Sequence, residues 1–306
     1  MRKDRLLERF LRYVAISSQS STKVKTVPSS DGQWDMARLL AKELTALGLV
    51  DVEISDYAVV TAKLPSNLPE GVKVPTVGWC AHMDTVDAGL SPDIHPQVIK
   101  NYQGGDICLN KEKDIWMRVA EHPEAERYIG DDLVVTDGTS VLGADNKSAI
   151  ANVMTALEIV IQENRPHGTI HVAFVPDEEI GLLGAKKIDF SKFPVDFAYT
   201  IDSCELGELV YQTFNAGGAT LTIRGVTAHP MSAKGVLVNP TLIACDFVNA
   251  LDRKETPECT EDTEGFIWVH SIVSNPRVAT VGIKIRDHNL EGYIHKKAKI
   301  EEVVEH

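Results

Sequence analysis

The chain of 306 residues is acidic but otherwise ordinary in composition, with 43% hydrophobic residues, 25% charged residues and a formal net charge of −13. This negative charge argues against nucleic acid or an anionic membrane as a partner, because basic patches hold both. The length exceeds one typical hydrophobic core, so two domains are expected. No signal-peptide core or bilayer-length apolar stretch is found, and five cysteines without close pairing indicate reduced thiols, so a cytoplasmic location is predicted.

The first part of the chain alternates between helix and strand patterns. Apolar residues at helical spacing predict an amphipathic helix over residues 1–18, and a second over Gln33–Leu47, which Gly48 ends. Buried strands are predicted from four apolar runs: Thr76–Cys80, Leu133–Leu142, Thr169–Val175 and Phe197–Ile201. We therefore expect an α/β domain over residues 1–207, with a mostly parallel central sheet and helices on both faces.

The pattern changes after residue 207. Strands are predicted over Ala219–Arg224, Phe266–Ile272 and Ala279–Ile285, and a helix over Pro240–Leu251. Residues 208–306 are thus expected to form a smaller α+β domain, with helices on one face of an antiparallel sheet. The polar region Leu90–Asp132 is predicted to be an irregular excursion from the first domain.

Acidic residues follow each of the four predicted strands of the first domain. In chain order they are Asp84, which comes two residues after His82, then Asp145, then Glu178 and Glu179, then Asp202. Because the carboxyl ends of parallel strands converge on one crevice, these side chains are expected to meet there. Several carboxylates around one imidazole would repel one another unless cations lay among them, and such ligands suit zinc, manganese or cobalt. The sequence therefore predicts a two-metal hydrolase centre.

The spacing of these residues indicates which role each of them can take in the metal centre. Residues 82 and 84 share one face of a strand, so Asp84 can accept the second ring proton of His82. Glu178 and Glu179 are neighbours that cannot point the same way, so one can bind metal while the other reaches the attacking water. Asp145 lies near a predicted helix start, where backbone N–H groups would help to hold its carboxylate.

Each of these residues also has an ordinary structural interpretation. Asp145 alone could be a helix N-cap, the Glu178–Glu179 pair a solvated strand end, and Asp202 a turn residue. The combination after four strand ends favours the metal interpretation. Two other chemistries fit less well. A Ser-His-Asp hydrolase needs a Gly-x-Ser-x-Gly elbow that is not found, and a retaining glycosidase has no use for the histidine.

Two cysteines lie near the predicted metal ligands, Cys80 and Cys204. Either could be proposed as a ligand, but cysteines in strands are more often small buried hydrophobic residues. We interpret both in that way.

Several motifs together resemble the peptidase M20 family of di-zinc exopeptidases, and within it the tripeptide aminopeptidases. The motifs, in chain order, are Ala81-His-Met-Asp-Thr-Val86, Tyr102-Gln-Gly-Gly-Asp106, Thr136-Asp-Gly138, Leu142-Gly-Ala-Asp-Asn-Lys-Ser148, Pro176-Asp-Glu-Glu-Ile-Gly181, Thr200-Ile-Asp202, Thr227-Ala-His-Pro230 and Ile285-Arg-Asp-His288. The resemblance extends over essentially the whole chain and implies a zinc-exopeptidase-like catalytic domain with a smaller lid domain.

The resemblance also implies roles for individual residues. Two zinc ions, or manganese or cobalt, would be bound by His82, Asp145, Glu179 and Asp202, with Asp145 bridging them. Glu178 would be the general base and Asp84 would orient His82. In the smaller domain, His229 would stabilise the oxyanion, a role that commonly contributes strongly to catalysis. The alternative for His229 is a surface histidine in the turn before Pro230.

Substrate recognition and assembly are further implications of the resemblance. Asn239 and Arg286 would bind the carboxylate of the substrate, and the arginine fork suits that task, although exposed arginines are usually only solvated. The expected activity is release of the N-terminal residue from short peptides, especially tripeptides. Another M20-type carboxypeptidase, acylase or deacylase activity is the alternative. The lid domain of relatives often pairs with a second subunit, so a homodimer is expected.

One feature departs from the family pattern. Family members continue beyond the position of His306 and supply one more histidine ligand, and nothing after residue 288 resembles that segment. We assign none of His288, His295 and His306 as the missing ligand. One metal site is therefore expected to be incomplete, and an inactive peptide- or metal-binding chain is the alternative from another functional class.

Overall fold

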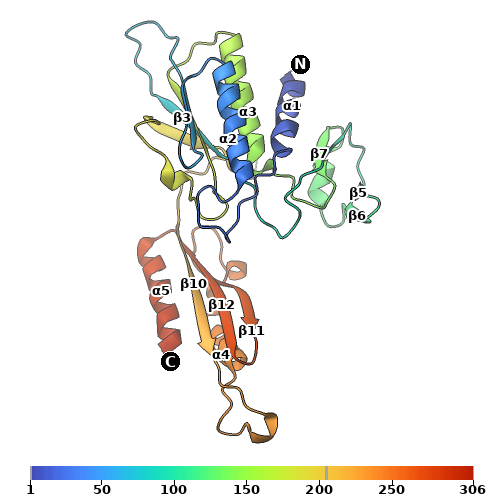
Figure 1. The fold of residues 1–306 in the computed structure, drawn as a ribbon, viewed down its shortest axis with the longest axis vertical. Coiled ribbons are helices and arrows are strands. Elements are labelled where there is room, and N and C mark those ends of the chain that lie inside the picture. The colour runs from blue at the N-terminus through green and yellow to red at the C-terminus, as the bar shows by residue number, and fades with distance from the viewer. Residues whose placement is uncertain (1, 204–205, 306) are drawn as a thin grey trace. The chain divides into compact units, whose positions relative to one another are not determined.

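The computed structural model describes residues 2–203 and 206–305, which fall into two compact units, Met1–Leu206 and Gly207–His306. Each unit has its own sheet and its own core (Figure 1). In the described part of the chain, none of the helices combines the length and the apolar character that a membrane span requires.

The first unit is built on a five-stranded sheet in the spatial order β1-β2-β8-β3-β9. The strands are β1 (Val50–Ile54), β2 (Val60–Leu64), β3 (Val77–His82), β8 (Ile170–Val175) and β9 (Phe197–Thr200). β3 pairs in parallel with β8 and with β9, whereas β2 is antiparallel to both of its neighbours. Only β2 therefore runs against the other four strands, and the prediction of a mostly parallel sheet is confirmed.

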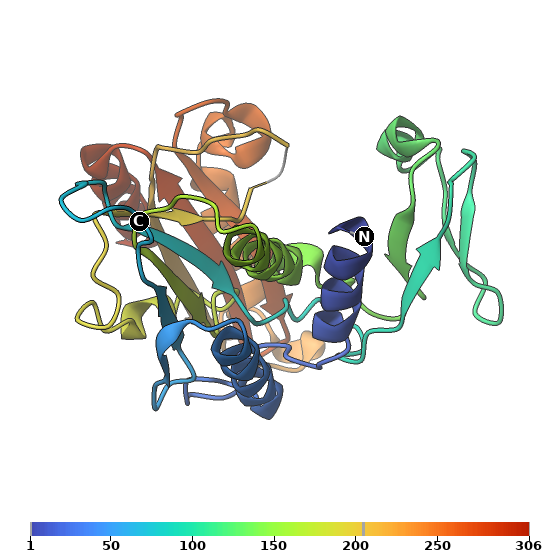
Figure 2. The same ribbon diagram turned by 90° about the horizontal axis from the view of Figure 1, so that it is seen from above.

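The described α-helices of this unit lie on one side of the sheet, where the second and third pack on the strands and the first packs on the third. They are α1 (Arg2–Val14), α2 (Asp31–Ala46) and α3 (Ala144–Gln162), and Figure 2 looks down α2 and α3 beside the strands. Leu40 of α2, Ile150 of α3 and Phe174 of β8 are fully buried in a single core. Burying each such side chain contributes about 1.5–3 kcal/mol to folding.

The opposite face of the sheet differs from the prediction of helices on both faces. In the described residues it is covered by a loop whose Phe193 is 2% exposed and packs edge-on against His171. A side chain at Gly78 would collide with the Phe193 ring, so the glycine allows this close approach. One aromatic ring on a loop thus covers part of the face where a helix was expected.

The predicted strand Leu133–Leu142 is wrong in both extent and place. The observed strand β7 (Leu133–Thr136) pairs with β4 (Pro96–Ile99) in a separate two-stranded sheet, beside a hairpin of β5 (Ile107–Asn110) and β6 (Ile115–Met117). β7 ends because Gly138 adopts a φ of 76° while the Asp137 carboxylate accepts the Thr139 N–H. The excursion therefore folds as a small ordered lobe, which the polar composition did not indicate.

β9 was predicted to be buried, but it is the edge strand of the sheet. Phe197 and Tyr199 are each 44% exposed. β9 is apolar but exposed, because among the described residues it pairs with β3 alone.

The second unit is a three-stranded antiparallel sheet with two helices on one face. Its strands are β10 (Asn215–Arg224), β12 (Val278–Asp287) and β11 (Phe266–Ser274), in that spatial order, and its helices are α4 (Pro240–Ala250) and α5 (Leu290–Glu305). Phe247 of α4 and Ile300 of α5 share a core with Val281 and Ile283 of β12. The predicted α+β architecture is confirmed, whereas α5 was not predicted because its charged sequence places few residues in that core.

Candidate metal centre

The predicted metal-binding residues of the first unit lie together at the carboxyl ends of β3, β8 and β9. β3 lies between β8 and β9, and the parallel register pairs His82 with Val175 and Cys80 with Thr200. The residues that follow β8 and β9 therefore emerge on either side of His82. The start of α3 adds Asp145 from outside the sheet.

His82 is the centre of this cluster. Its ring is 2% exposed, and its Nε2 donates to Oδ1 of Asp145 at 2.8 Å. The same nitrogen lies 3.8 Å from Oε2 of Glu178 and 3.8 Å from Oδ2 of Asp202. Two groups of potential ligands result, His82–Asp145–Glu179 and His82–Glu178–Asp202, each with its ligand atoms within 4.8 Å of one another. One imidazole nitrogen with carboxylate oxygens is a donor set that zinc, manganese and cobalt accept.

Asp84 supports both sides of the cluster. It is fully buried, and its backbone carbonyl accepts a hydrogen bond from Nδ1 of His82 at 3.0 Å, with its carboxylate 3.4 Å from the same nitrogen. The carboxylate also accepts the backbone N–H groups of Glu178 at 2.9 Å and Glu179 at 3.2 Å. Asp84 therefore fixes both the imidazole ring and the acid pair, as we call Glu178 and Glu179. Its hydrogen bonds to the acid pair were not predicted.

The carboxylates of the cluster outnumber its one imidazole, and most of the pKa values are shifted toward the protonated form. Burial opposes protonation of His82, but the Asp145 and Asp84 carboxylates raise its pKa to about 10. Burial, followed by the charge of Asp145, raises the pKa of Glu179 to about 7, and burial also raises the pKa values of Glu178 and Asp202. The hydrogen bond from His82 lowers the pKa of Asp145. Bound cations would supply the charge that protons supply here, so these residues fit metal ions.

The local structure around Asp145 differs from the prediction. Asp145 lies within α3 but has ψ of 107°, so the regular helix begins only after Asn146. In the described structure, its carboxylate is held by the His82 ring instead of by helix N–H groups.

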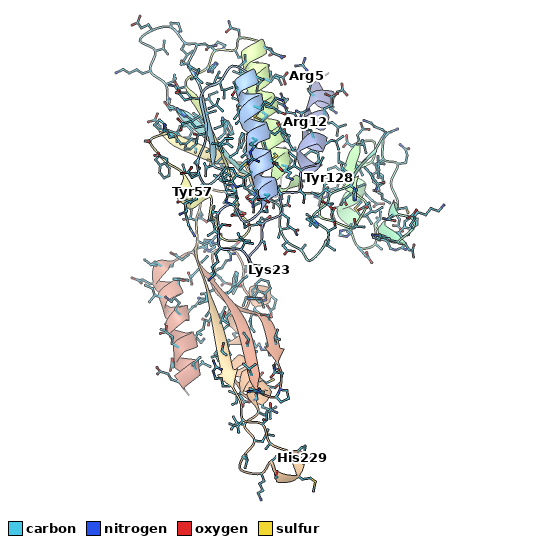
Figure 3. The ribbon with its side chains drawn as sticks, in the orientation of Figure 1. Arg5, Arg12, Lys23, Tyr57, Tyr128 and His229 are labelled. Atoms are coloured by element: carbon cyan, nitrogen blue, oxygen red, sulfur yellow. The ribbon has the colours of Figure 1, made fainter. Side chains whose placement is uncertain are left out.

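The second unit carries His229 and Asn239 at one end of its sheet. The Val226–Val238 bridge closes the loop that contains His229, and Figure 3 shows His229 near the tip of that loop. The exposed His229 accepts the Met231 N–H through Nδ1 at 3.3 Å, and the Asn239 side chain caps α4. Both side chains thus make local structural hydrogen bonds.

Arg286 lies at the other end of the same sheet. Its guanidinium is 4.5 Å from the centre of the Phe214 ring, and it pairs with Ala216 in the β10–β12 ladder, eight residues from Val278. At about 3.3 Å per residue, Arg286 is roughly 26 Å along β12 from the end that carries Asn239. One copy of the second unit therefore does not bring Asn239 and Arg286 together.

Where the structure describes them, the other cysteines and histidines that the sequence raised belong to neither ligand group. Cys80 belongs to neither ligand group, and burial raises its thiol pKa to about 11. The ring of His288 packs against Phe214. Cys204 and His306 lie outside the described residues.

Sequence reasoning missed the buried residues that hold the chain before the acid pair. Gln33 and Ser29 hydrogen bond to Asp177, which directly precedes Glu178. A glutamine in the first turn of a helix is common, and only its complete burial distinguishes it. The sequence carries no local signal of that burial.

Comparisons with known proteins agree with this architecture. Residues 211–306 match the M20 peptidase dimerisation domain. A peptidase T-like protein of Rhizobium meliloti is 52% identical over 303 residues, covering 99% of this chain and 73% of its own length. Peptidase T of Geobacillus kaustophilus is 44% identical over 302 residues, covering 98% and 73%.

A solved structure shows the same fold. The crystal structure of aminopeptidase PepT from Bacillus cereus superposes with a TM-score of 0.68 at 24% identity, covering 98% of this chain and 71% of that one. With two relatives well above 30% identity over nearly the entire chain, the chain belongs to the peptidase T family of M20 peptidases.

Proposed function

We propose that this peptidase is a two-zinc aminopeptidase that releases the N-terminal residue of short peptides, especially tripeptides. The observation that carries the proposal is the gathering of the Asp145, Glu178, Glu179 and Asp202 carboxylates around the single buried imidazole of His82. Membership of the peptidase T family supports peptide hydrolysis as the reaction.

The metal-binding residues in this proposal are His82, Asp145, Glu179 and Asp202, with Asp145 touching both ions. Its position beside both His82 and Asp202 supports a bridging role. When bound, such ions polarise the scissile carbonyl and lower the pKa of a nearby water. Zinc is favoured by the histidine ligand, and manganese or cobalt would also accept these donors.

Glu178 is proposed as the general base. Burial raises its pKa, which brings the carboxylate closer to the range where a base works well at neutral pH. It would take the proton of the attacking water and pass it to the leaving amine. Asp84 would keep Glu178 in position through the backbone N–H and hold the His82 ring through Nδ1.

The second unit is proposed to contact the substrate and a second copy of the chain. His229 would donate to the oxyanion, and Asn239 and Arg286, which lie far apart in one copy, would bind the substrate carboxylate from different copies of the chain. The match to a dimerisation domain supports a homodimer, and the edge strand β11 offers exposed Trp268, Ile272 and Val273 for that contact.

A substrate panel tests the reaction. The zinc-loaded chain would be offered a free tripeptide, the same tripeptide with a blocked amino terminus, and an N-acyl amino acid, with products identified by mass spectrometry. We expect the free tripeptide alone to be cleaved, yielding its first residue and a dipeptide. Release of the last residue, or cleavage of the acyl amino acid, would contradict the aminopeptidase assignment and favour the carboxypeptidase or acylase alternative.

A further inference from the structure

Asp177, which leads the chain from β8 into the acid pair, is a fully buried carboxyl residue without a role in the proposed reaction. Its φ of 51° places it in the left-handed region. A residue other than glycine held there costs of order 1–3 kcal/mol, so surrounding contacts have to maintain the conformation.

Gln33 supplies those contacts with both ends of its side-chain amide. Its Oε1 accepts the backbone N–H of Asp177 at 2.9 Å, and its Nε2 donates to Oδ1 of the same residue at 2.7 Å. The Ser29 hydroxyl donates to that oxygen as well, at 2.6 Å. Gln33 is fully buried and Ser29 is 6% exposed, so water does not replace these bonds readily.

The acid pair is consequently fixed from two directions. Asp84 holds the N–H groups of Glu178 and Glu179, and Gln33 holds the residue just before them. A rotation at Asp177 would move both glutamate side chains, because the chain direction into residue 178 is set there. The side chain of Gln33 lies in the first turn of α2, which fixes it to the core of the unit.

We propose that Gln33, together with Ser29, is a positioning residue that sets the backbone at Asp177 and so aims Glu178 and Glu179 at the metal centre. The inference rests on the proposed roles of those two glutamates.

The test exploits the complementary chemistry of the Gln33–Asp177 pair. Gln33→Glu places one carboxylate against another and should lower kcat for trialanine about 10- to 100-fold, with KM changed much less, because small displacements of catalytic groups have effects of that size. Asp177→Asn keeps an accepting oxygen for Gln33 and should stay near wild type. The double variant Gln33→Glu/Asp177→Asn lets the new amide donate to the new carboxylate and should recover most of the lost kcat.

A second readout is independent of turnover. Co²⁺ titration, followed by visible absorption, should show weaker binding in Gln33→Glu and recovery in the double variant. Tyr13→Phe is the matched control, because it removes a hydrogen bond to Glu43 within the same unit and should lower stability without lowering kcat.

Two outcomes would overturn the inference: an unchanged kcat and Co²⁺ affinity in Gln33→Glu, or a double variant no better than that single variant. Glu178→Gln is measured in parallel to separate the two proposals. Full activity in Glu178→Gln would contradict the proposed function. The positioning role of Gln33 would then be judged from Co²⁺ affinity alone, and equal affinity in wild type and Gln33→Glu would overturn it.

Discussion

At the scale of single residues, one imidazole organises the centre. His82 belongs to both potential ligand groups, and Asp84 connects its ring to the backbone of the acid pair. Burial is the main cause of the raised pKa of Glu178 and of the raised pKa of Glu179, which is about 7. Because both shifts have the same cause, the pKa values do not show which glutamate is the general base and which binds metal. Substitution and pH dependence separate these roles.

The roles of the two glutamates predict different losses. Glu178→Gln should keep the bound zinc and lower kcat by roughly 10³-fold, within the range for a general base. Glu179→Gln should instead lose metal together with activity. Metal content by mass spectrometry, measured beside kcat, checks this, and loss of zinc from Glu178→Gln would show that the two roles are exchanged.

The pKa values also predict how metal binding depends on pH. Ligands have to be deprotonated to bind metal, so affinity rises with pH wherever binding displaces protons. The His82 proton has to leave at any pH below about 10, and a Glu179 proton adds to it below about 7. The apparent association constant should therefore rise about tenfold per pH unit above neutrality and about a hundredfold per unit below it. Zinc titrations on either side of pH 7 measure this slope, and a slope that is the same throughout would contradict the Glu179 contribution.

At the scale of elements, the end of β12 and the helix α5 are joined by a buried ion pair. Lys296 of α5 donates to Oδ2 of Asp287 at 2.9 Å, and their side chains are 10% and 8% exposed. Burial opposes ionisation of Asp287, but the hydrogen bonds from Lys296 and from the Asn289 N–H lower its pKa overall. The pair therefore fixes α5 to the sheet while both groups are charged.

Removing one partner should destabilise the second unit. Lys296→Met leaves the Asp287 carboxylate buried without its cation and should cost about 3–5 kcal/mol of unfolding free energy. Lys297→Met on the same helix is exposed and should change little. Denaturant unfolding of the full chain measures both, and equal effects of the two variants would contradict the importance of the buried pair.

The pH dependence of that contribution has a definite sign. Because the folded pKa of Asp287 is lowered, its stabilisation is present above the ordinary carboxyl pKa and is lost as the pH falls through the folded value. The stability difference between wild type and Lys296→Met should therefore shrink in acid.

At the scale of the whole molecule, the two units differ in what they offer to partners. The first unit has an apolar hollow of about 310 Å³ beside β3 and α3, lined by residues such as Trp79, Leu157 and Ile201. The second unit matches a dimerisation domain and leaves β11 at the edge of its sheet. An unpaired edge strand is a natural site for pairing with another chain.

The proposed homodimer predicts an effect of charge on that edge. Ile272→Lys should shift the chain toward the monomer, because a lysine on an edge strand opposes pairing. Val304→Lys on α5 is a matched control with similar exposure. Light scattering over a concentration series measures the molecular mass, and a dimer that persists unchanged in Ile272→Lys would place the interface elsewhere.

The sequence by itself determined which residues form the centre, because carboxylates placed after successive strands have to converge when those strands are parallel. His82, Glu178, Glu179 and Asp202 could therefore be predicted together, whereas Asp145 follows a strand of a separate sheet and reaches the cluster from the start of α3. The alternation of patterns likewise indicated an α/β unit followed by an α+β unit, since burial periodicity is a local property of the chain.

Only the tertiary structure decided the features that depend on contacts between distant residues. An apolar run indicates burial but not its partner, so β7 left the central sheet and β9 became an exposed edge. Nothing local shows that Arg286 and Asn239 lie at opposite ends of one sheet. The hydrogen bonds between Gln33 and Asp177 join residues 144 positions apart, and they form only once packing has buried both groups.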